Sequence, residues 1–314
     1  MVFIGKRLLI TLVTLLMVSL FTFAAFTIIP GDPATLALGI EASDEQIAEL
    51  RAKMGLDRSF LEQYVRYLYN FLTGNLGNSS RFQGMPISRM ILERLPVTFS
   101  LAGFSLLLIL AIAFPLILLS VKREGSFLDL LLNTITTMNI SLPSFFLGVL
   151  YIWLFGIILR LFTPSAYISY RDSFPRFLAY LFFPALAIAT PNAAILIKFM
   201  RTAIFKEYHN DYVRTAHSKG NSHRQTLLHH VFKNALIPGI TMLGMIIADI
   251  FSGSIVIEQV FTIPGIGRLL ITAISSRDYP LVETLVLYIA FVVILANTLV
   301  DIVIQVIDPR IRVQ

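Results

Sequence analysis

Five histidines are the residues of this chain best suited to hold a metal ion, and they gather in one stretch: His209, His217, His223, His229 and His230. Imidazole binds transition metals and changes its charge near neutral pH. A metal site would also need cysteines or paired carboxylates at ligand spacing, and neither lies near these histidines. The chain has no cysteine, which also excludes disulfides and thiol nucleophiles. We interpret the histidines as part of a basic, solvated surface and expect no metal site.

Seven polar residues stand inside or at the ends of long apolar runs: Asn133, Asn139, Lys198, Asp249, Glu258, Asn297 and Asp301. If these runs cross a bilayer, such side chains are costly there and are functional candidates. We expect Asn133, Asn139, Asp249 and Asn297 to be candidates for lining a translocation path. The alternative is that they make hydrogen bonds between helices or contact a partner subunit. The other three lie near the ends of the runs and could reach the membrane interface.

No nucleotide-binding motif is present in the sequence. The only Gly-Lys dipeptide is Gly5-Lys6, and no glycine-rich run precedes it, so a phosphate-binding P-loop is not predicted. We expect no catalytic residues and no cofactor bound by this chain. Energy for transport would then come from a partner protein or from an ion gradient.

Composition indicates which elements must position these residues. Of 314 residues, 56% are hydrophobic and 14% are charged, and the mean hydropathy is +0.77. Soluble domains carry about 25% charged residues, so lipid must be the solvent for much of this chain. A membrane helix needs roughly 20 apolar residues, and six stretches qualify: 8–29, 97–121, 127–162, 180–199, 237–261 and 281–307. We predict an all-α, polytopic membrane protein with six transmembrane helices, the third long enough to include a bend.

Basic residues predict the orientation of these spans. They cluster before the first span, between the second and third, between the fourth and fifth, and after the sixth: Lys6 and Arg7; Lys122 and Arg123; Arg201, Lys206, Arg214, Lys219, Arg224 and Lys233; Arg310 and Arg312. By the positive-inside rule these segments and both termini are cytoplasmic. The predicted organisation is an N-terminal segment with the first span (1–29), an extracytoplasmic helical segment (30–96) and a transmembrane core (97–314) that includes a cytoplasmic loop (200–236). The first apolar run is too long for a signal peptide, so we expect it to remain uncleaved.

Two amphipathic helices are predicted in the extracytoplasmic segment. Each begins with a capping box and ends near a glycine: Ser43 with Gln46 and then Gly55, and Ser59 with Glu62 and then Gly74. The preferred interpretation is that they lie on the body of the protein. A docking surface for an external partner is the alternative.

The cytoplasmic loop has the signals of a helix, a glycine and a second helix. Asn210 suits an N-cap, Asp211 and Lys219 place favourable charges at the two helix ends, and Gly220 suits a left-handed C-terminal position. Ser222 then caps a second helix. Because such a unit buries little of its own surface, it must pack against the ends of the spans or against another protein.

Motifs along nearly the whole chain resemble one family of transport proteins. The loop sequence DYVRTAHSKG at 211–220, followed by KNALIP, is similar to the EAA-type loop of binding-protein-dependent ABC importer permeases of the peptide/nickel branch. Further similar segments follow in order: PGDPA at 30–34, MGLDRSFLEQY at 54–64, GNLGNS at 74–79, ERLPVTFSLA at 93–102, SLPSFFLG at 141–148, IEQVFTIPGIGRLL at 257–270, RDYP at 277–280 and NTLVDIVIQVIDPRIR at 297–312. The loop lacks the paired alanines and the Leu-Pro of the broader pattern, which favours this branch over the sugar branches.

This resemblance implies the type I ABC importer permease fold and a location in a bacterial or archaeal inner membrane. It also implies a second homologous permease subunit, two ATPase subunits that carry ATP and Mg, an extracytoplasmic binding protein and no nucleic-acid partner. In such permeases the short helix before the glycine docks on the ATPase. The residues expected to make this contact are Asp211, Tyr212, Val213, Arg214, Thr215, Ala216, Lys219 and Gly220.

Two functions remain open at this point: a permease subunit of an ABC importer, and a gradient-driven secondary transporter or channel. The second predicts inverted repeats or paired broken spans, which the sequence does not clearly contain. The resemblance leaves peptides, nickel, metal–chelator complexes and oligosaccharides as possible substrates. The spans contain no histidine or cysteine to hold bare nickel, so peptides are favoured.

Overall fold

The structure is a computed structural model that describes residues 2–28, 33–38, 42–82, 84–164 and 166–307. Within these ranges all the secondary-structure elements are helices, and one isolated β-bridge joins Asn78 to Pro86. The chain divides into two compact units, residues 1–97 with 264–295 and residues 98–263 with 296–314. Part of the PGDPA motif and the basic pair Arg310 and Arg312 lie outside the described residues.

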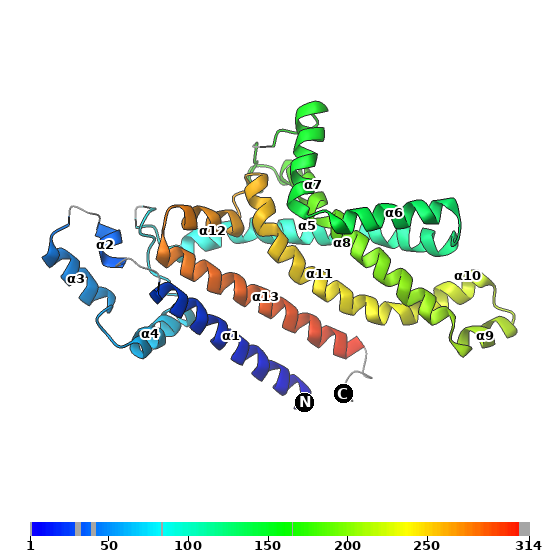
Figure 1. Ribbon diagram of the computed structural model, residues 1–314, viewed down its shortest axis with the longest axis horizontal. Coiled ribbons are helices and arrows are strands. Elements are labelled where there is room, and N and C mark those ends of the chain that lie inside the picture. The colour runs from blue at the N-terminus through cyan, green and yellow to red at the C-terminus, as the bar shows by residue number, and fades with distance from the viewer. Residues whose placement is uncertain (1, 29–32, 39–41, 83, 165, 308–314) are drawn as a thin grey trace. The chain divides into compact units, whose positions relative to one another are not determined.

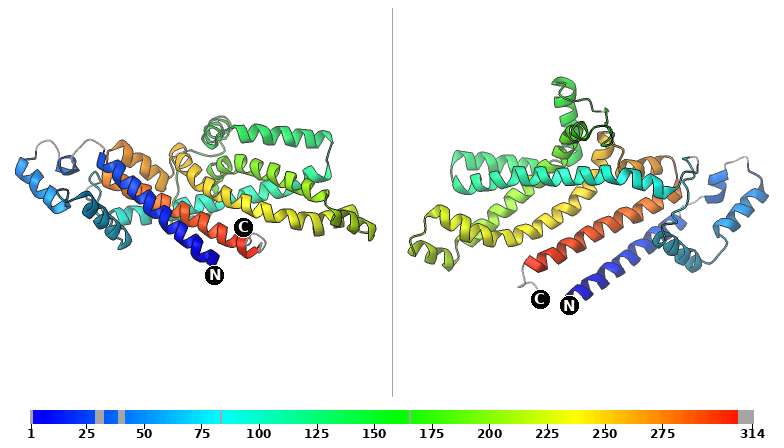
Figure 2. Two further views of the ribbon diagram at one scale, coloured as in Figure 1. Left: turned by 60° about the horizontal axis from the view of Figure 1, so that its bottom comes forward. Right: turned by 180° about the vertical axis from the view of Figure 1, so that it is seen from behind.

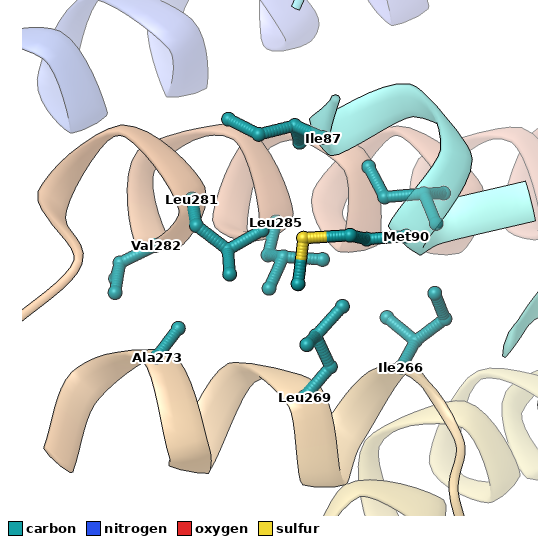
Figure 3. Close-up of a cluster of buried hydrophobic side chains, with 9 residues drawn as sticks. Ile87, Met90, Ile266, Leu269, Ala273, Leu281, Val282 and Leu285 are labelled. Atoms are coloured by element: carbon teal, nitrogen blue, oxygen red, sulfur yellow. The ribbon is translucent and has the colours of Figure 1, made fainter. Parts of the chain in front are cut away.

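The first unit contains the four N-terminal helices, one complete helix from later in the chain and the first parts of two long helices. They are α1 (Val2–Ile28), α2 (Pro33–Leu38), α3 (Asp44–Met54), α4 (Phe60–Leu72), the start of α5 (Ile87–Lys122), α12 (Ile266–Ser275) and the start of α13 (Tyr279–Ile307) (Figure 1). Its core lies where α5, α12 and α13 meet. Met90, Leu269 and Leu285 are all buried there, and Figure 3 shows their side chains pointing toward one another from the three helices.

Capping residues begin the two helices predicted between 43 and 74. The Ser43 hydroxyl accepts the backbone N–H of Gln46, whose side chain accepts the Ser43 N–H, and Gly55 ends α3 with a φ of 74°. At α4 the Ser59 hydroxyl accepts the N–H of Glu62 at 3.4 Å. Both predicted helices are confirmed, and their ends follow from local hydrogen bonds. The complete capping box forms at Ser43, whereas at Ser59 only the bond from the Glu62 N–H is present.

One face of α4 packs on α1, as expected for an amphipathic helix lying on the body of the protein. The hydroxyls of Ser19 and Tyr64 share a hydrogen bond of 2.8 Å, and the ring of Phe23 stacks on Tyr67 at 5.4 Å. The opposite face exposes an apolar stripe that includes Leu61 and Leu72.

The second unit contains the remaining helices and the bent span. They are α6 (Phe127–Ser141), α7 (Ser144–Tyr151), the π-helical η1 (Ile152–Ile158), α8 (Phe174–Tyr208), α9 (Asp211–Ser218), α10 (His223–Thr226), the π-helical η2 (Leu227–Val231) and α11 (Phe232–Val260). The chain turns by 103° between Phe127–Ser141 and Ser144–Ile158. Leu142 is extended there because the proline at 143 disfavours the helical conformation in the residue before it.

The six-span prediction is confirmed: five described helices are long and apolar enough to cross a membrane, and the bent pair makes up to six. Two of the predicted spans were too short: α5 begins at Ile87 rather than 97, and α8 runs over Phe174–Tyr208 rather than 180–199. Hydropathy identifies only the part of a helix that needs lipid. Polar turns such as the one with Arg89 and Glu93 continue the helix without that signal.

Glu258 corrects one expectation about the apolar runs. It was expected to reach the membrane interface, but its side chain is fully buried and its carboxylate accepts a hydrogen bond of 2.6 Å from the Thr98 hydroxyl. An acid buried this way ties α11 to α5 within the second unit. A single sequence cannot reveal such a pair, because 160 positions separate the two residues.

Candidate coupling site

The loop predicted to be cytoplasmic folds as a short helix, a glycine turn and a second helix. Helix α9 begins at Asp211, the residue after the predicted N-cap, and ends at Ser218. Gly220 has a φ of +85°, the left-handed conformation predicted for it. Ser222 and Gln225 then form the predicted capping box, with bonds of 3.1 and 3.3 Å. Figures 1 and 2 show α9 and α10 together at the tip where α8 ends and α11 begins.

Helix α9 has one face turned toward this chain and one toward solvent. Val213 and Ala216 are only 4% and 7% exposed. Asp211, Arg214 and Thr215 are exposed, as are the following Lys219 and Gly220. The side chains of Val213 and Ala216, both expected to meet the ATPase, are buried against this chain itself, so the exposed set forms the available surface.

The Tyr212 hydroxyl ties α9 to the end of α8. It donates a 2.7 Å hydrogen bond to Glu207, and the Asn210 amide donates to the same carboxylate oxygen at 2.9 Å. Burial, together with the bond to Glu207, raises the pKa of Tyr212 above its ordinary value, while Asn234 at the start of α11 acts in the opposite direction. Tyr212 thus touches the last turn of α8 and the first turn of α11.

Glu207 also lines a groove of about 600 Å³ between α8 and α11. Lys198, Thr202 and Lys206 line it from α8, and Pro238 and Met242 line it from α11. The same carboxylate therefore borders the groove and holds α9. A displacement of α9 would act directly on the walls of this groove.

An ion pair fixes α8 to the turn between α5 and α6. Arg201 donates a 2.7 Å hydrogen bond to Asp129, which also accepts from the Ser120 hydroxyl at 2.9 Å and from the backbone N–H of Gly125 at 3.2 Å. The Arg201 guanidinium also lies over the Phe205 ring, 5.2 Å from its centroid. These contacts secure the stretch of α8 that leads into the loop.

Two loop histidines bond to their own helices. His209 Nδ1 lies 2.8 Å from the Phe205 carbonyl oxygen, and His229 Nδ1 lies 3.3 Å from that of Gln225, so in each ring this nitrogen carries the donated proton. Among the described side chains, which exclude those of His217 and His223, no group of three or more histidines or acids could hold a metal ion.

The four candidates for the translocation path lie on three helices of the second unit. Asn133, Asp249 and Asn297 are exposed, and Asn133 lines a shallow hollow on α6. Asn139 is half-buried and donates to the Ile135 carbonyl at 2.9 Å. No described hydrogen bond or ion pair joins any two of the four. Their exposure on membrane-spanning helices leaves them available to a path or to a partner subunit.

Sequence reasoning missed Glu207, Asp129 and the pairing role of Arg201. Arg201 was counted only among the basic residues that predict the orientation, and Glu207 was not singled out. One local signal existed, because Asp129 stands three residues after Ser126 and its N–H bonds to that hydroxyl at an N-cap. Nothing local predicts the Arg201 partner, 72 positions away.

Comparison with known families defines the class of protein that carries this loop. The family described as the binding-protein-dependent transport system inner membrane component matches residues 111–313. The family that describes the N-terminal region of such components matches residues 1–102. This chain belongs to that family of multi-pass inner-membrane permease components of ABC transporters. Its members work with ATPase and binding-protein partners, and a permease of this kind is generally not itself a catalyst.

Individual relatives align with the chain from end to end. A putative peptide transport system permease protein of Brucella abortus is 35% identical, with 98% of each chain covered. The probable peptide ABC transporter permease protein y4tP of Sinorhizobium fredii is 34% identical, with 99% of each covered. The oligopeptide transport system permease protein AppB of Bacillus subtilis is 32% identical, again with 99% of each covered.

Proposed function

We propose that this chain is the permease subunit of an ATP-driven importer that carries peptides delivered by an extracytoplasmic binding protein. The observation that carries the proposal is the end-to-end similarity to several permeases named for peptide transport. The spans offer no histidine or cysteine for bare nickel, which further favours peptides over metal ions. Nickel or a metal–chelator complex remains the alternative cargo.

A second homologous permease subunit would complete the path, and Asn133, Asn139, Asp249 and Asn297 are the residues of this chain proposed to line it. Two ATPase subunits would bind ATP and Mg. Neither cofactor would bind this chain, which has no P-loop.

Helix α9 is the proposed contact with the ATPase. A helix of eight residues is too short to persist alone in water, where fewer than about 12 residues are marginal. Its exposed residues Asp211, Arg214, Thr215 and Lys219, with Gly220, offer charge and small size to a partner groove. Movement of the ATPase would then reach α8 and α11 through Tyr212, whose hydroxyl meets Glu207.

Reconstitution tests this function. The permease pair, both ATPases and the binding protein are placed in proteoliposomes, and uptake of labelled peptides is compared with uptake of nickel and of a nickel–chelator complex. We expect peptide uptake that requires both ATP and the binding protein. Uptake driven by an ion gradient without ATP, or uptake of nickel alone, would overturn the proposal.

Labelling of introduced cysteines tests the proposed orientation, since the native chain has no cysteine to react. A membrane-impermeant thiol reagent should modify Glu45→Cys in intact cells and spare Lys219→Cys, because the charge distribution places 30–96 outside. After permeabilisation both should react. The reverse pattern in intact cells would invert the topology.

A further inference from the structure

A small cavity in the first unit contains polar groups that no contact described so far uses. Its volume is about 280 Å³, and it lies between the end of α4, the turn that follows and the start of α13. Its polar lining comes from Tyr67, Asn70, Asn75, Glu283 and Thr284. None of the lining residues is basic.

Two buried oxygens at this cavity have no hydrogen-bond partner among the described residues: the Tyr67 hydroxyl and Oε1 of Glu283. Burying a carboxylate without a cation or donors is unfavourable, so such a group indicates a missing partner. Burial, and secondly the negative charge of Glu283, raises the pKa of Tyr67 above its ordinary value. The tyrosine therefore lies close to the carboxylate and keeps its proton.

The neighbouring groups that line the cavity supply hydroxyls and amides but no cation. The Thr284 hydroxyl already donates to the Pro280 carbonyl at 2.8 Å. Asp278, the acid nearest to Glu283 along the chain, already accepts hydrogen bonds from Ser79, Ser80 and Arg81. The amides of Asn70 and Asn75 can supply carbonyl oxygens but no positive charge. The cavity is thus an acceptor-rich site with one carboxylate and no cation.

An ammonium or guanidinium group fits this chemistry better than a metal ion. Its N–H donors match the Glu283 carboxylate, the Tyr67 oxygen and an asparagine carbonyl, and the tyrosine ring can face the cation. Calcium would require six or more oxygens and usually several carboxylates. A volume of about 280 Å³ accommodates one extended basic side chain, and a small rotation of the carboxylate would expose Oε1 to it.

The mouth of the cavity favours a protein as the source of this cation. Asn75 and Gly77, which line it, are exposed, and so are their neighbours Gly74 and Asn78 in the same polar turn. A polar rim around a desolvated pocket is the usual setting of an anchor residue in a protein–protein interface. The charge distribution also places this segment outside the cell.

We propose that this cavity receives a lysine or arginine side chain of the extracytoplasmic binding protein, held by Glu283 and Tyr67. This inference rests on the proposed function, because it assumes that a binding protein delivers the cargo. It adds one named contact, on the outer side of this chain, through which delivery would occur.

Titration of the binding protein against the assembled transporter in nanodiscs tests the contact. Glu283→Gln should weaken binding about thirty-fold or more, because a buried basic group would lose its charged partner. Tyr67→Phe should weaken it about five-fold. The control is Glu62→Gln. Glu62 is an exposed acid on α4, the helix of Tyr67, and this change should alter the affinity less than about two-fold. The unfolding temperature of Glu283→Gln alone should stay equal or rise, because an unpartnered buried charge is removed.

A charge scan of the binding protein completes the test. One lysine or arginine there, changed to glutamine, should reproduce the loss and add nothing to Glu283→Gln. Equal affinity for wild type and Glu283→Gln would overturn the inference. The inference would also fail if Glu283→Gln kept its affinity for the binding protein but took up peptides with a free amino terminus less well than acetylated peptides. The cavity would then bind cargo. If the wild-type transporter itself does not bind the binding protein, the proposed function fails instead.

Discussion

Two short segments of this protein are each tied down by a carboxylate, in very different ways. On the side that the charge distribution predicts to be extracytoplasmic, Asp278 is fully buried. It accepts hydrogen bonds from the hydroxyls of Ser79 and Ser80 and from the backbone N–H groups of Ser80 and Arg81. We call this set the outer clasp. On the side predicted to be cytoplasmic, Glu207 is half-buried, and among the described residues it accepts hydrogen bonds from Asn210 and Tyr212 alone.

The difference indicates which segment can move. Hydrogen bonds to a buried charge are worth about 1.5–3 kcal/mol each, and leaving their donors unpaired is costly. Around Glu207, water can replace a lost donor, so its contacts can break and reform at a cost of about 1 kcal/mol. A fixed outer clasp and a loosely held inner helix suit a protein that must transmit movement on one side only. The predictions below test that contrast.

Breaking the outer clasp should have the largest effect. Asp278→Ala would leave two serine hydroxyls and the Ser80 N–H without their acceptor, while the Arg81 N–H would keep its bond to the Ser79 hydroxyl. We expect the substitution to lower the free energy of unfolding by about 3 kcal/mol or more. Thermal unfolding of the purified permease in detergent measures this loss. Proteolysis between α4 and α5 should accelerate as well.

A matched acid provides the control for this measurement. Asp57 is exposed and pairs with Arg51 at 3.3 Å, so Asp57→Ala should cost less than about 1 kcal/mol. Equal losses for the two variants would show that the outer clasp is no stronger than a surface ion pair.

Reversing charge on the exposed face of α9 should have the next largest effect. Arg214→Glu should weaken ATPase binding about ten-fold or more, since it places a like or unpaired charge in the proposed contact. Co-purification of the ATPase and peptide uptake are the measurements. Lys233→Glu makes the same change at an exposed position of the loop outside α9 and should have little effect. An equal loss of ATPase binding and uptake in the two variants would indicate a general effect of charge.

Ala216→Arg does not test the same contact. Because Ala216 is 7% exposed, an arginine there would disturb the packing of α9 on its own chain before it met any partner. Thr215→Arg, one residue earlier and exposed, is the informative substitution. It should abolish the response of ATP hydrolysis to loaded binding protein while insertion in the membrane stays normal.

A smaller effect is expected at the glycine that ends the loop helix. A Cβ built at Gly220 meets no described atom within 4 Å beyond its chain neighbours, so the obstacle to substitution that the structure shows is the φ of +85°. A β-branched residue in that conformation costs roughly 1–2 kcal/mol. Gly220→Val should therefore reduce uptake about ten-fold with normal insertion. Gly220→Asn, which tolerates this conformation, should retain most activity, and wild-type uptake by Gly220→Val would contradict the argument.

Local chemistry made much of this structure predictable from the sequence. The capping residues Ser43, Ser59 and Ser222 and the left-handed Gly220 act through bonds between near neighbours, so their types and spacing were sufficient. The spans followed from hydropathy because lipid permits few other solutions. Pairs such as Arg201 with Asp129 were not predictable, since they depend on which helices meet. Nor was the inward face of α9, because its amphipathic pattern does not say whether its own chain or a partner covers the apolar side.

Removing one hydroxyl from the inner contact should have the smallest effect and is the most specific test of the contrast. Tyr212→Phe deletes the 2.7 Å bond to Glu207, worth about 1 kcal/mol, and leaves the ring in place. We expect an ATPase that still binds and still hydrolyses ATP, with uptake per ATP reduced several-fold. The raised pKa of Tyr212 means that the folded state favours the protonated hydroxyl. Its contribution is therefore fully present below the ordinary value of 10.0 and is lost only as the pH rises above it. The ratio of uptake to hydrolysis should then differ between wild type and Tyr212→Phe by a constant factor from pH 6 to pH 9. A difference that vanishes within that range would assign the coupling to another titrating group, and no difference at all would mean that α9 moves α8 without Glu207.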